Sequence, residues 1–594
     1  MRFSNTGFLT AVATATTIAS ANRRMVRERS ARAEALARAG LSGNTALPVP
    51  DPCSSRVDSA PMYDLLVIGG GINGTGVARD ASLRGLKVAL VEREDWGAGT
   101  TGASTRMVHG GLRYLLYDVP TTRTSSEDAG RIRRIAPHVT WRIPFLWPLF
   151  PGSRFMAEAT EALVSAYDVH ARHKGGLQHA RLSASEARQL EPGLAQDIAG
   201  AVTLDEWGCD VFRLAALNAL DAKEHGATLL PHTEAVELLF SGRTVRGARL
   251  RDRLDGTERE IEAKLVINAG GPWADRIAEL AGAQVAMRPG KGVHVTFERR
   301  IGNFGLILEG VDGRVMFLVP HGAETIVGTT DSDYYGDPAH ADLDIHRDEV
   351  AYVIEAAARA LPQARSWRPL RAWAGVRNTL FEWGVDSDNL SRRHEILDHE
   401  VRDKVPGLLS IVGGKLAAYR LQSEEAVDLA LQKLGRPHVS SSSGSEPLPG
   451  AEPEPDFVAL SREIPLPPAV LERVWRRVGG RVRAIFASAA ATDLSPICRS
   501  EGVTPAEVRY AVEIEGCRTL EDLRRHSHIG AGACDGNDCA NAAALHMSAL
   551  LDWSADRIAA ELDAFWNERW AGRRPVLTGI ALAHEEVSRG VEAN

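Results

Sequence analysis

The glycine-rich segment Gly69–Gly74 constrains the fold of this chain more than any other feature. It reads Gly-Gly-Gly-Ile-Asn-Gly, which matches the spacing G-x-G-x-x-G, and the short apolar run Tyr63–Ile68 stands directly before it. Ile72–Arg84 follows with helical spacing, and Leu86–Glu92 has the pattern of a second buried strand. Strand, helix and strand within about 30 residues form a βαβ unit. The segment therefore predicts a Rossmann-type α/β fold that binds a dinucleotide.

Each glycine of that spacing has a physical task. Gly69 makes the tight turn, Gly71 lets the backbone approach a pyrophosphate, and Gly74 permits close packing of helix on strand. The pyrophosphate then lies at a helix N-terminus, where unpaired N–H groups and the helix dipole favour an anion. Glu92 ends the second strand about 20 residues further on, where an acid accepts hydrogen bonds from the adenosine ribose.

The rest of the chain predicts two further units. Lys264–Asn268 is another buried strand, whereas Val293–Phe297, Val315–Val319 and Thr325–Gly328 suit an antiparallel sheet. A parallel sheet interrupted by an antiparallel one indicates a cofactor domain with an inserted substrate domain. Ser440–Asp456 has the composition of a linker, and amphipathic helices follow it. We expect an N-terminal extension without fixed structure over 1–61, the cofactor and substrate domains over 62–439, a linker over 440–456 and a small, mostly helical domain over 457–594.

The composition limits the possible partners and compartments. Of 594 residues, 44% are hydrophobic and 25% charged, and a formal charge of -8 argues against a nucleic-acid partner. Six cysteines in so long a chain predict a reducing compartment. We expect a cytoplasmic protein, with peripheral contact to the inner face of the cell membrane left open. Trp141–Phe150 suits either a membrane interface or the core of the substrate domain.

A second group of small residues favours FAD over NAD. Gly97–Thr105 is rich in Gly, Ser and Thr directly after the ribose acid, and it offers backbone N–H groups and hydroxyls to a second phosphate and a flavin. Gly413–Leu416 precedes a helix and suits the flavin ring edge and ribityl chain. The predicted FAD-binding residues are Gly69, Gly71, Gly74, Glu92, Thr100, Thr101, Ser104, Gly270, Gly413, Gly414, Lys415 and Leu416.

With these motifs the chain resembles the FAD-dependent glycerol-3-phosphate dehydrogenases. The resemblance runs from about Tyr63 to Gly572, and it rests on His109–Tyr114, Gly328–Asp331, Gly375–Arg377 and Gly413–Arg420. The first of these motifs is similar to the aerobic, quinone-reducing branch. Two others, Phe212–Ala227 and Asn567–Trp570, are more similar to the catalytic subunit of the anaerobic enzyme.

The resemblance implies non-covalent FAD and oxidation of sn-glycerol 3-phosphate to dihydroxyacetone phosphate, with electrons passing to quinone or a partner protein. A secondary alcohol must lose a proton to a base and a hydride to flavin N5. By resemblance His294 is the candidate base, and Arg377 holds the phosphate, with Arg392 as a second candidate ahead of its neighbour Arg393. Lys415 stabilises the reduced flavin, and His109 and Tyr114 either take part in the chemistry or only pack under the flavin.

Two features leave the function open at this stage. Asn378 replaces the usual Pro, and Ala418 replaces the usual hydroxyl residue, so the substrate could be a relative of glycerol 3-phosphate. The alternatives are a related FAD enzyme acting on an amine or a 2-hydroxy acid, and a non-catalytic flavoprotein. An enzyme that oxidises an amino acid needs one Arg to bind the carboxylate and no second cationic group, so a second phosphate-binding Arg separates these alternatives.

The C-terminal cysteines resemble a small iron–sulfur module with one ligand missing. Cys498-Arg499-Ser500 and Cys534-x4-Cys539 match a C-x-C and C-x4-C pattern, except that Ser500 stands at the second position. Four thiolates are the usual ligand set of a [2Fe–2S] cluster, and a serine alkoxide is a much poorer ligand. We therefore predict no metal in this module, which keeps its fold.

Overall fold

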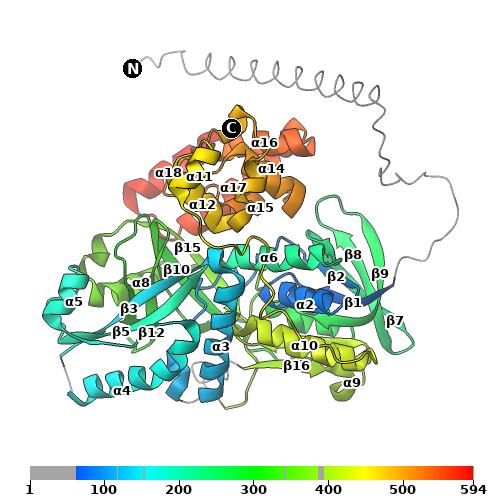
Figure 1. Cartoon of the computed structure of the whole chain (residues 1–594), viewed down its shortest axis with the longest axis horizontal. Helices are drawn as coiled ribbons and strands as arrows, with labels where there is room; N and C mark the ends of the chain where they lie inside the picture. The colour runs from blue at the N-terminus through cyan, green and yellow to red at the C-terminus, as the bar shows by residue number, and fades with distance from the viewer. Residues whose placement is uncertain (1–61, 117, 152–153, 340–342, 385–392, 593–594) are drawn as a thin grey trace. The chain divides into compact units, whose positions relative to one another are not determined.

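The computed structural model describes residues 62–594, apart from 117, 152–153, 340–342, 385–392 and 593–594. The expected N-terminal extension lies outside the described residues, as does Arg392. The described chain contains one sheet of 8 strands and one of 9 strands, with helices around both (Figure 1). Within the described residues no helix is both long enough and apolar enough to cross a bilayer.

The first sheet is built on the predicted βαβ unit. It contains β1 Tyr63–Ile68, β2 Val88–Val91, β6 Thr228–Leu230, β7 Thr233–Ser241, β8 Thr244–Asp252, β9 Glu258–Asn268, β16 His394–Asp398 and β17 Leu408–Gly413. The main order is β16-β17-β9-β1-β2-β6, parallel except for β16, with the β7–β8 hairpin joined to β9. The central strand β1 is therefore bordered by parallel strands on both sides, as its unbroken apolar run predicts.

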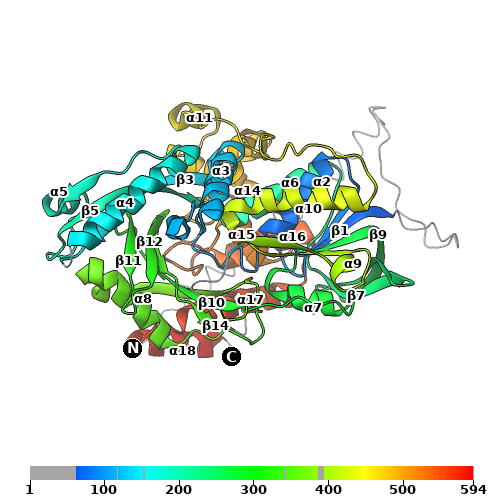
Figure 2. The same cartoon turned by 90° about the horizontal axis from the view of Figure 1, so that it is seen from below.

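Helices and a hairpin bury both faces of this sheet. The helices of the first two domains are α2 Ile72–Leu83, α3 Val119–Ile135, α4 Arg154–Ala171, α5 Ala184–Leu190, α6 Val211–Glu224, α7 Ala274–Glu279, α8 Arg347–Ala360, α9 His399–Arg402 and α10 Tyr419–Lys433. Leu65 and Val67 of β1 share one core with α2, α6 and α10 (Figure 2). Leu66 and Ile68 point to the opposite core, with α7 and the β7–β8 hairpin. Alternate side chains of β1 thus fill two cores.

The second sheet is mostly antiparallel and is inserted between strands of the first. It contains β3 Thr140–Leu149, β4 Arg181–Ser183, β5 Gly200–Cys209, β10 Gly290–Phe297, β11 Gly305–Glu309, β12 Val315–His321, β13 Glu324–Gly328, β14 Ser332–Asp333 and β15 Pro369–Arg377. The stretch with two open interpretations, Trp141–Phe150, forms β3, whose Phe145 and Leu146 are buried in the core. The predicted α/β fold with an inserted antiparallel sheet is confirmed.

The C-terminal part is helical, as predicted. Its helices are α11 Phe457–Glu463, α12 Pro468–Val478, α13 Val482–Phe486, α14 Pro505–Tyr510, α15 Leu520–Ser527, α16 Ala540–Leu551, α17 Ala555–Arg573 and α18 Gly579–Glu592. One of these helices is irregular, because α14 continues into a π-helical turn over Ala511–Glu515. The segment 440–456 has no helix or strand, and the Ser443 carbonyl accepts a hydrogen bond of 2.8 Å from Arg79 of α2.

Candidate active site

A cavity of about 850 Å³ lies where the two sheets meet. On one side it is lined by the residues that follow the carboxyl ends of β1, β2, β9 and β17, and on the other by side chains of β3, β5, β12 and β15. The carboxyl edge of a parallel sheet is the usual ligand position in such folds, and the volume is typical of a ligand site.

The predicted glycine turn forms one end of the cavity. Gly69 has φ +110°, a conformation that side chains rarely adopt, and a Cβ on Gly74 would overlap the carbonyl oxygen of Gly69. A Cβ on Gly71 would meet only the Thr101 hydroxyl, at 3.4 Å, so this glycine faces the cavity. The turn therefore needs Gly69 and Gly74 for its own packing, whereas Gly71 leaves room for a ligand.

Glu92 lies in the cavity wall beside this turn. Its carboxylate accepts hydrogen bonds from the backbone N–H groups of Gly70 at 2.5 Å and Glu94 at 2.9 Å. Burial raises the pKa of Glu92 to about 6, although both hydrogen bonds favour the charged form. Each oxygen keeps acceptor capacity for a ribose hydroxyl.

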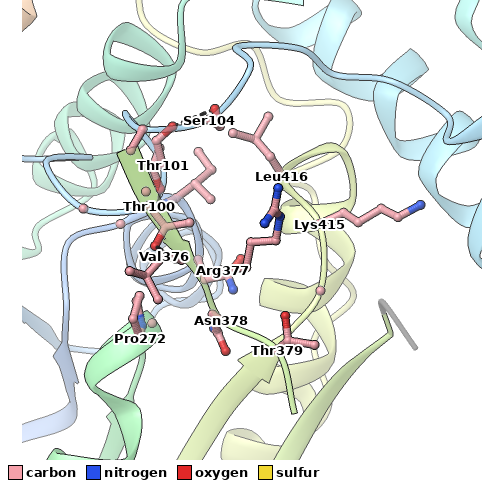
Figure 3. Close-up of a pocket in the computed structure, with 18 of the residues that line it drawn as sticks. Thr100, Thr101, Ser104, Pro272, Val376, Arg377, Asn378, Thr379, Lys415 and Leu416 are labelled. Atoms are coloured by element: carbon pink, nitrogen blue, oxygen red, sulfur yellow. Dashed lines mark hydrogen bonds between the residues drawn. The ribbon is translucent and has the colours of Figure 1, made fainter. Parts of the chain in front are cut away.

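The hydroxyls predicted to bind the cofactor line the cavity but are engaged by the chain itself. Thr101 accepts the N–H of Ile72 at 3.0 Å, Thr100 donates to the Val376 carbonyl at 2.6 Å, and Ser104 donates to the Thr101 carbonyl at 2.9 Å. Figure 3 shows Thr100 and Thr101 on one side of the end of β15, with Lys415 and Leu416 on the other. These side chains hold the loop against α2 and β15, and they shape the cavity wall.

The loop after β17 forms another part of the cavity wall. Gly413 and Gly414 have φ +72° and +86°, so both positions favour glycine. The N–H of Gly413 donates to the side chain of Asn378 at 2.9 Å, which ties this loop to the end of β15. Gly270 also lines the cavity, and its N–H donates to the Asn268 side chain at 3.0 Å.

The buried side chain of Gln422, in this wall, has an oxygen atom to which a ligand could donate a hydrogen bond. Gln422 is 1% exposed, and its amide N–H donates to the Lys415 carbonyl at 2.8 Å, which fixes the orientation of the amide. Its carbonyl oxygen has no hydrogen-bond partner in the part of the chain that the structure describes. An unsatisfied buried acceptor in a cavity wall fits a ligand with hydrogen-bond donors. Together with the glycine turn, it fits the predicted dinucleotide.

A cationic cluster also lines the cavity. Arg377, at the end of β15, contacts Asp331 at 2.6 Å, and Arg314 contacts the same carboxylate at 3.3 Å. All three residues line the cavity, where two guanidinium groups share one carboxylate; Asp312, which does not line the cavity, lies 4.0 Å from Arg314. The sequence indicated Arg377 but not Arg314, which stands in the turn before β12 with no recognisable motif around it.

Lys415, Tyr114 and His109 lie together in the same cavity. The Lys415 ammonium is 3.3 Å from the centre of the Tyr114 ring, a cation–π contact. The His109 ring is tilted against Phe317, with 6.0 Å between the ring centres. The structure thus brings Lys415 and Tyr114 into contact, and His109 and Arg377 line the same cavity.

His294 lies one layer behind the cavity wall. Its Nε2 is 2.9 Å from the Thr105 hydroxyl, which lines the cavity, and its ring stacks on Trp373. Burial, with the charges of Arg377 and Arg106, lowers the pKa of His294 to about 3, so its imidazole is neutral at neutral pH. His294 therefore reaches a ligand only through Thr105.

The remaining predicted and divergent positions have different surroundings. Arg392 lies outside the described residues, and its neighbour Arg393 is 60% exposed and contacts Asp118 at 3.4 Å. Asn378 lines the cavity, whereas Ala418 lines only a neighbouring cavity of about 180 Å³. Of the two departures from the family pattern, only Asn378 therefore borders the main cavity.

The four C-terminal positions of the iron–sulfur pattern lie in neighbouring pairs. The Ser500 hydroxyl is 3.7 Å from the Cys534 sulfur, and a hydrogen bond with Cys539 lowers the pKa of the Cys498 thiol. Among the described residues, no group of three or more His, Cys, Asp or Glu side chains is arranged to hold a metal ion.

We expect the purified protein to contain no stoichiometric [2Fe–2S] cluster, because Ser500 leaves an incomplete set of thiolates. Iron and acid-labile sulfide would be measured on anaerobically purified protein, beside a Ser500→Cys variant. Iron in the variant alone would identify Ser500 as the cause. About two iron atoms per chain in the unchanged protein would contradict the prediction.

Comparison with known proteins follows the division seen in the structure. The family described as FAD dependent oxidoreductase matches residues 64–420, and the family described as C-terminal domain of alpha-glycerophosphate oxidase matches residues 441–558. One component of the anaerobic glycerol-3-phosphate dehydrogenase of Escherichia coli K12 is 35% identical over 538 residues, which cover 89% of this chain and 96% of the relative.

Two further proteins show the same similarity. The aerobic glycerol-3-phosphate dehydrogenase of Staphylococcus haemolyticus is 36% identical over 385 residues, or 63% of this chain and 67% of that protein. The solved structure of the glycerol-3-phosphate dehydrogenase of Bacillus halodurans, complexed with FAD, has a TM-score of 0.69 and 25% identity. It covers 88% of this chain and 97% of that one.

Proposed function

Because this chain belongs to the FAD-dependent glycerol-3-phosphate dehydrogenase family, as its motifs predicted, we propose that it oxidises sn-glycerol 3-phosphate to dihydroxyacetone phosphate. The observation that carries the proposal is the cluster of Arg377 and Arg314 around Asp331 in the cavity wall. Two guanidinium groups suit a phosphate, because Arg presents paired N–H donors to anionic oxygens.

The residues of the glycine turn, Glu92 and the loop after β17 would hold the cofactor. Gly71 and Gly74 would leave room for the pyrophosphate at the N-terminus of α2, and Glu92 would accept hydrogen bonds from the ribose. Gln422 offers its unsatisfied oxygen to a donor of the bound group. FAD, when bound, supplies the acceptor for the hydride that leaves C2 of the substrate.

We propose that the Thr105–His294 pair removes the proton of the substrate hydroxyl. Thr105 lines the cavity, so it can accept the hydroxyl proton while its own proton passes to His294 Nε2, 2.9 Å away. His294 is neutral at neutral pH and so has a lone pair for that proton, although a pKa of about 3 makes it a weak base. His109, which lines the cavity directly, is the second candidate for the base. Lys415, fixed over Tyr114, would stabilise negative charge on the cofactor side.

The electron acceptor that we propose is quinone or an electron-transfer partner, as the resemblance implies. Peripheral contact with the inner face of the membrane would give access to a lipid-soluble acceptor. Transfer of electrons to a soluble quinone analogue, compared with oxygen, would test this part of the proposal.

Glycerol 3-phosphate is expected to bleach the flavin absorbance of the anaerobic protein, and glycerol to do so far more slowly. Loss of a charged, hydrogen-bonded anchor costs about 2–5 kcal/mol. Rapid-mixing spectroscopy with both alcohols measures the ratio, and a 2-hydroxy acid and an amino acid test the alternative enzymes. Similar rates for glycerol and its phosphate would refute the phosphate site.

The same experiment separates the two candidate bases. Thr105→Val keeps the shape of the side chain but breaks the link to His294, so it should slow bleaching and change its dependence on pH. If His109→Asn slows the reaction and Thr105→Val does not, the base is His109.

A further inference from the structure

The C-terminal helix α15 lies directly against the segment that carries the ribose acid. This segment, Glu92–Trp96, follows β2 and continues into the loop that lines the cavity. His526 of α15 is buried, and its Nε2 lies 3.2 Å and 3.3 Å from the two carboxylate oxygens of Asp95. Arg525 lies 3.9 Å from the same carboxylate. A buried carboxylate in the cofactor loop is therefore neutralised by side chains of the C-terminal domain.

The strand end at His232 and Thr233 also holds this segment. His232, between β6 and β7, donates its backbone N–H to the Glu94 carbonyl at 2.8 Å. Its ring contacts Asp522 of α15 at 2.8 Å. Thr233 donates its N–H to the Glu92 carbonyl at 2.6 Å. The segment Glu92–Trp96 thus contacts α15 directly, and it also contacts His232 and Thr233, where His232 is itself bound to α15.

The helix itself is anchored by a buried ionic network. His526 Nδ1 lies 2.7 Å from Glu515, which also accepts two hydrogen bonds, of 2.6 Å and 2.7 Å, from Arg213 of α6. Burial opposes the charge of Glu515, but Arg213 and His526 lower its pKa to about 2. Because these groups are buried and paired, small shifts of α15 leave charges without partners, which makes its position well defined.

We propose that Asp522, Arg525 and His526 form a clamp, here called the α15 clamp, that positions Glu92–Trp96 and thereby retains FAD. The Gly97 N–H donates to the Gly70 carbonyl at 3.0 Å, so a displacement of Asp95 reaches the glycine turn through one residue of chain and one hydrogen bond. A module that lacks a full set of cluster ligands would then still serve the reaction, as a support for the cofactor site. This proposal rests on FAD being the cofactor of the protein. It does not depend on which substrate the protein oxidises.

The test is FAD binding by full-length protein from which the flavin has been removed. His526→Gln and Asp95→Asn should each raise the dissociation constant of FAD about tenfold, the size expected when contacting residues are uncoupled. The double variant should bind FAD no more weakly than either single variant, because both substitutions remove the same contact. His528→Gln is the matched control, since His528 pairs with Asp210, the N-cap of α6, at 2.6 Å at the same interface and forms no hydrogen bond or ion pair with Glu92–Trp96 among the described residues. It should bind FAD like the unchanged protein.

Thermal unfolding of the flavin-free proteins is measured in parallel to identify variants that fail to fold. If His526→Gln does not fold, Asp95→Asn carries the test. Unchanged FAD affinity in a folded His526→Gln or Asp95→Asn protein would overturn the proposal. So would an equal loss in His528→Gln, which would show a general effect of the interface. Neither outcome depends on whether glycerol 3-phosphate is oxidised.

Discussion

Replacement of Gly74 by alanine is expected to abolish the binding of FAD and to destabilise the protein by about 1–3 kcal/mol. The new methyl group would overlap the Gly69 carbonyl oxygen and lie 3.4 Å from the Ala269 side chain. The Gly69 carbonyl is part of the backbone of the glycine turn, so it cannot move without changing the turn. The helix α2 must then move away from β1, which displaces the N–H groups that receive the pyrophosphate. Flavin absorbance after gel filtration and thermal unfolding measure the two effects.

Gly71→Ala is the matched variant. Its methyl group would meet only Thr101, at 3.4 Å, and would otherwise point into the cavity. This variant should unfold at nearly the same temperature as the unchanged protein but bind FAD at least about tenfold more weakly. A Gly74→Ala protein that retains stoichiometric FAD would show that α2 does not pack on the turn as described.

Replacement of Arg377 by glutamine is expected to lower kcat/KM for glycerol 3-phosphate by about 10²- to 10³-fold. The change removes one of two guanidinium groups from the cluster and leaves Asp331 with Arg314, so a cationic anchor for the phosphate is lost. Because glycerol has no phosphate, its slow oxidation should change much less, although loss of the Arg377 charge would raise the pKa of His294. Steady-state rates with both alcohols therefore separate a phosphate anchor from a general loss of activity.

Arg365→Gln serves as the control for this experiment. Arg365 is 57% exposed and forms a surface pair with Glu355, which contributes little to stability. Its rates should match those of the unchanged protein. If Arg377→Gln slowed glycerol and glycerol 3-phosphate equally, Arg377 would act on the fold or on the reacting centre and not on the phosphate.

The parts of the fold that local sequence determines were predictable. The run Tyr63–Ile68 forms β1 with the predicted bounds, because a short apolar run ended by glycines has few other structures available. The pairing of β3 with β5 and of β10 with β15 was not predictable, since it joins segments far apart in the chain. Trp141–Phe150 illustrates this, because its burial depends on a partner strand that local pattern does not identify.

The residues of the candidate site also divide into those that the sequence predicted and those that only the structure revealed. Arg377 stands in a recognisable motif and lines the cavity, whereas Arg314 and Gln422 have no motif and were found only from their positions around it. The sequence indicated His294 but not that Thr105 separates it from the cavity. Thr100 and Thr101 illustrate a further limit, because a hydroxyl suited to a phosphate is equally suited to a backbone group of its own loop.

The order of strands in the parallel sheet also governs when the site can form during synthesis. β1 is the first of these strands to leave the ribosome, yet its neighbour β9 and the next strand β17 come from much later parts of the chain. Until they emerge, β1 has an exposed apolar edge, which is prone to association with other chains. The helix α15 follows later still. Because the cavity needs β17 and the loop after it, we expect flavin incorporation to follow the synthesis of most of the chain.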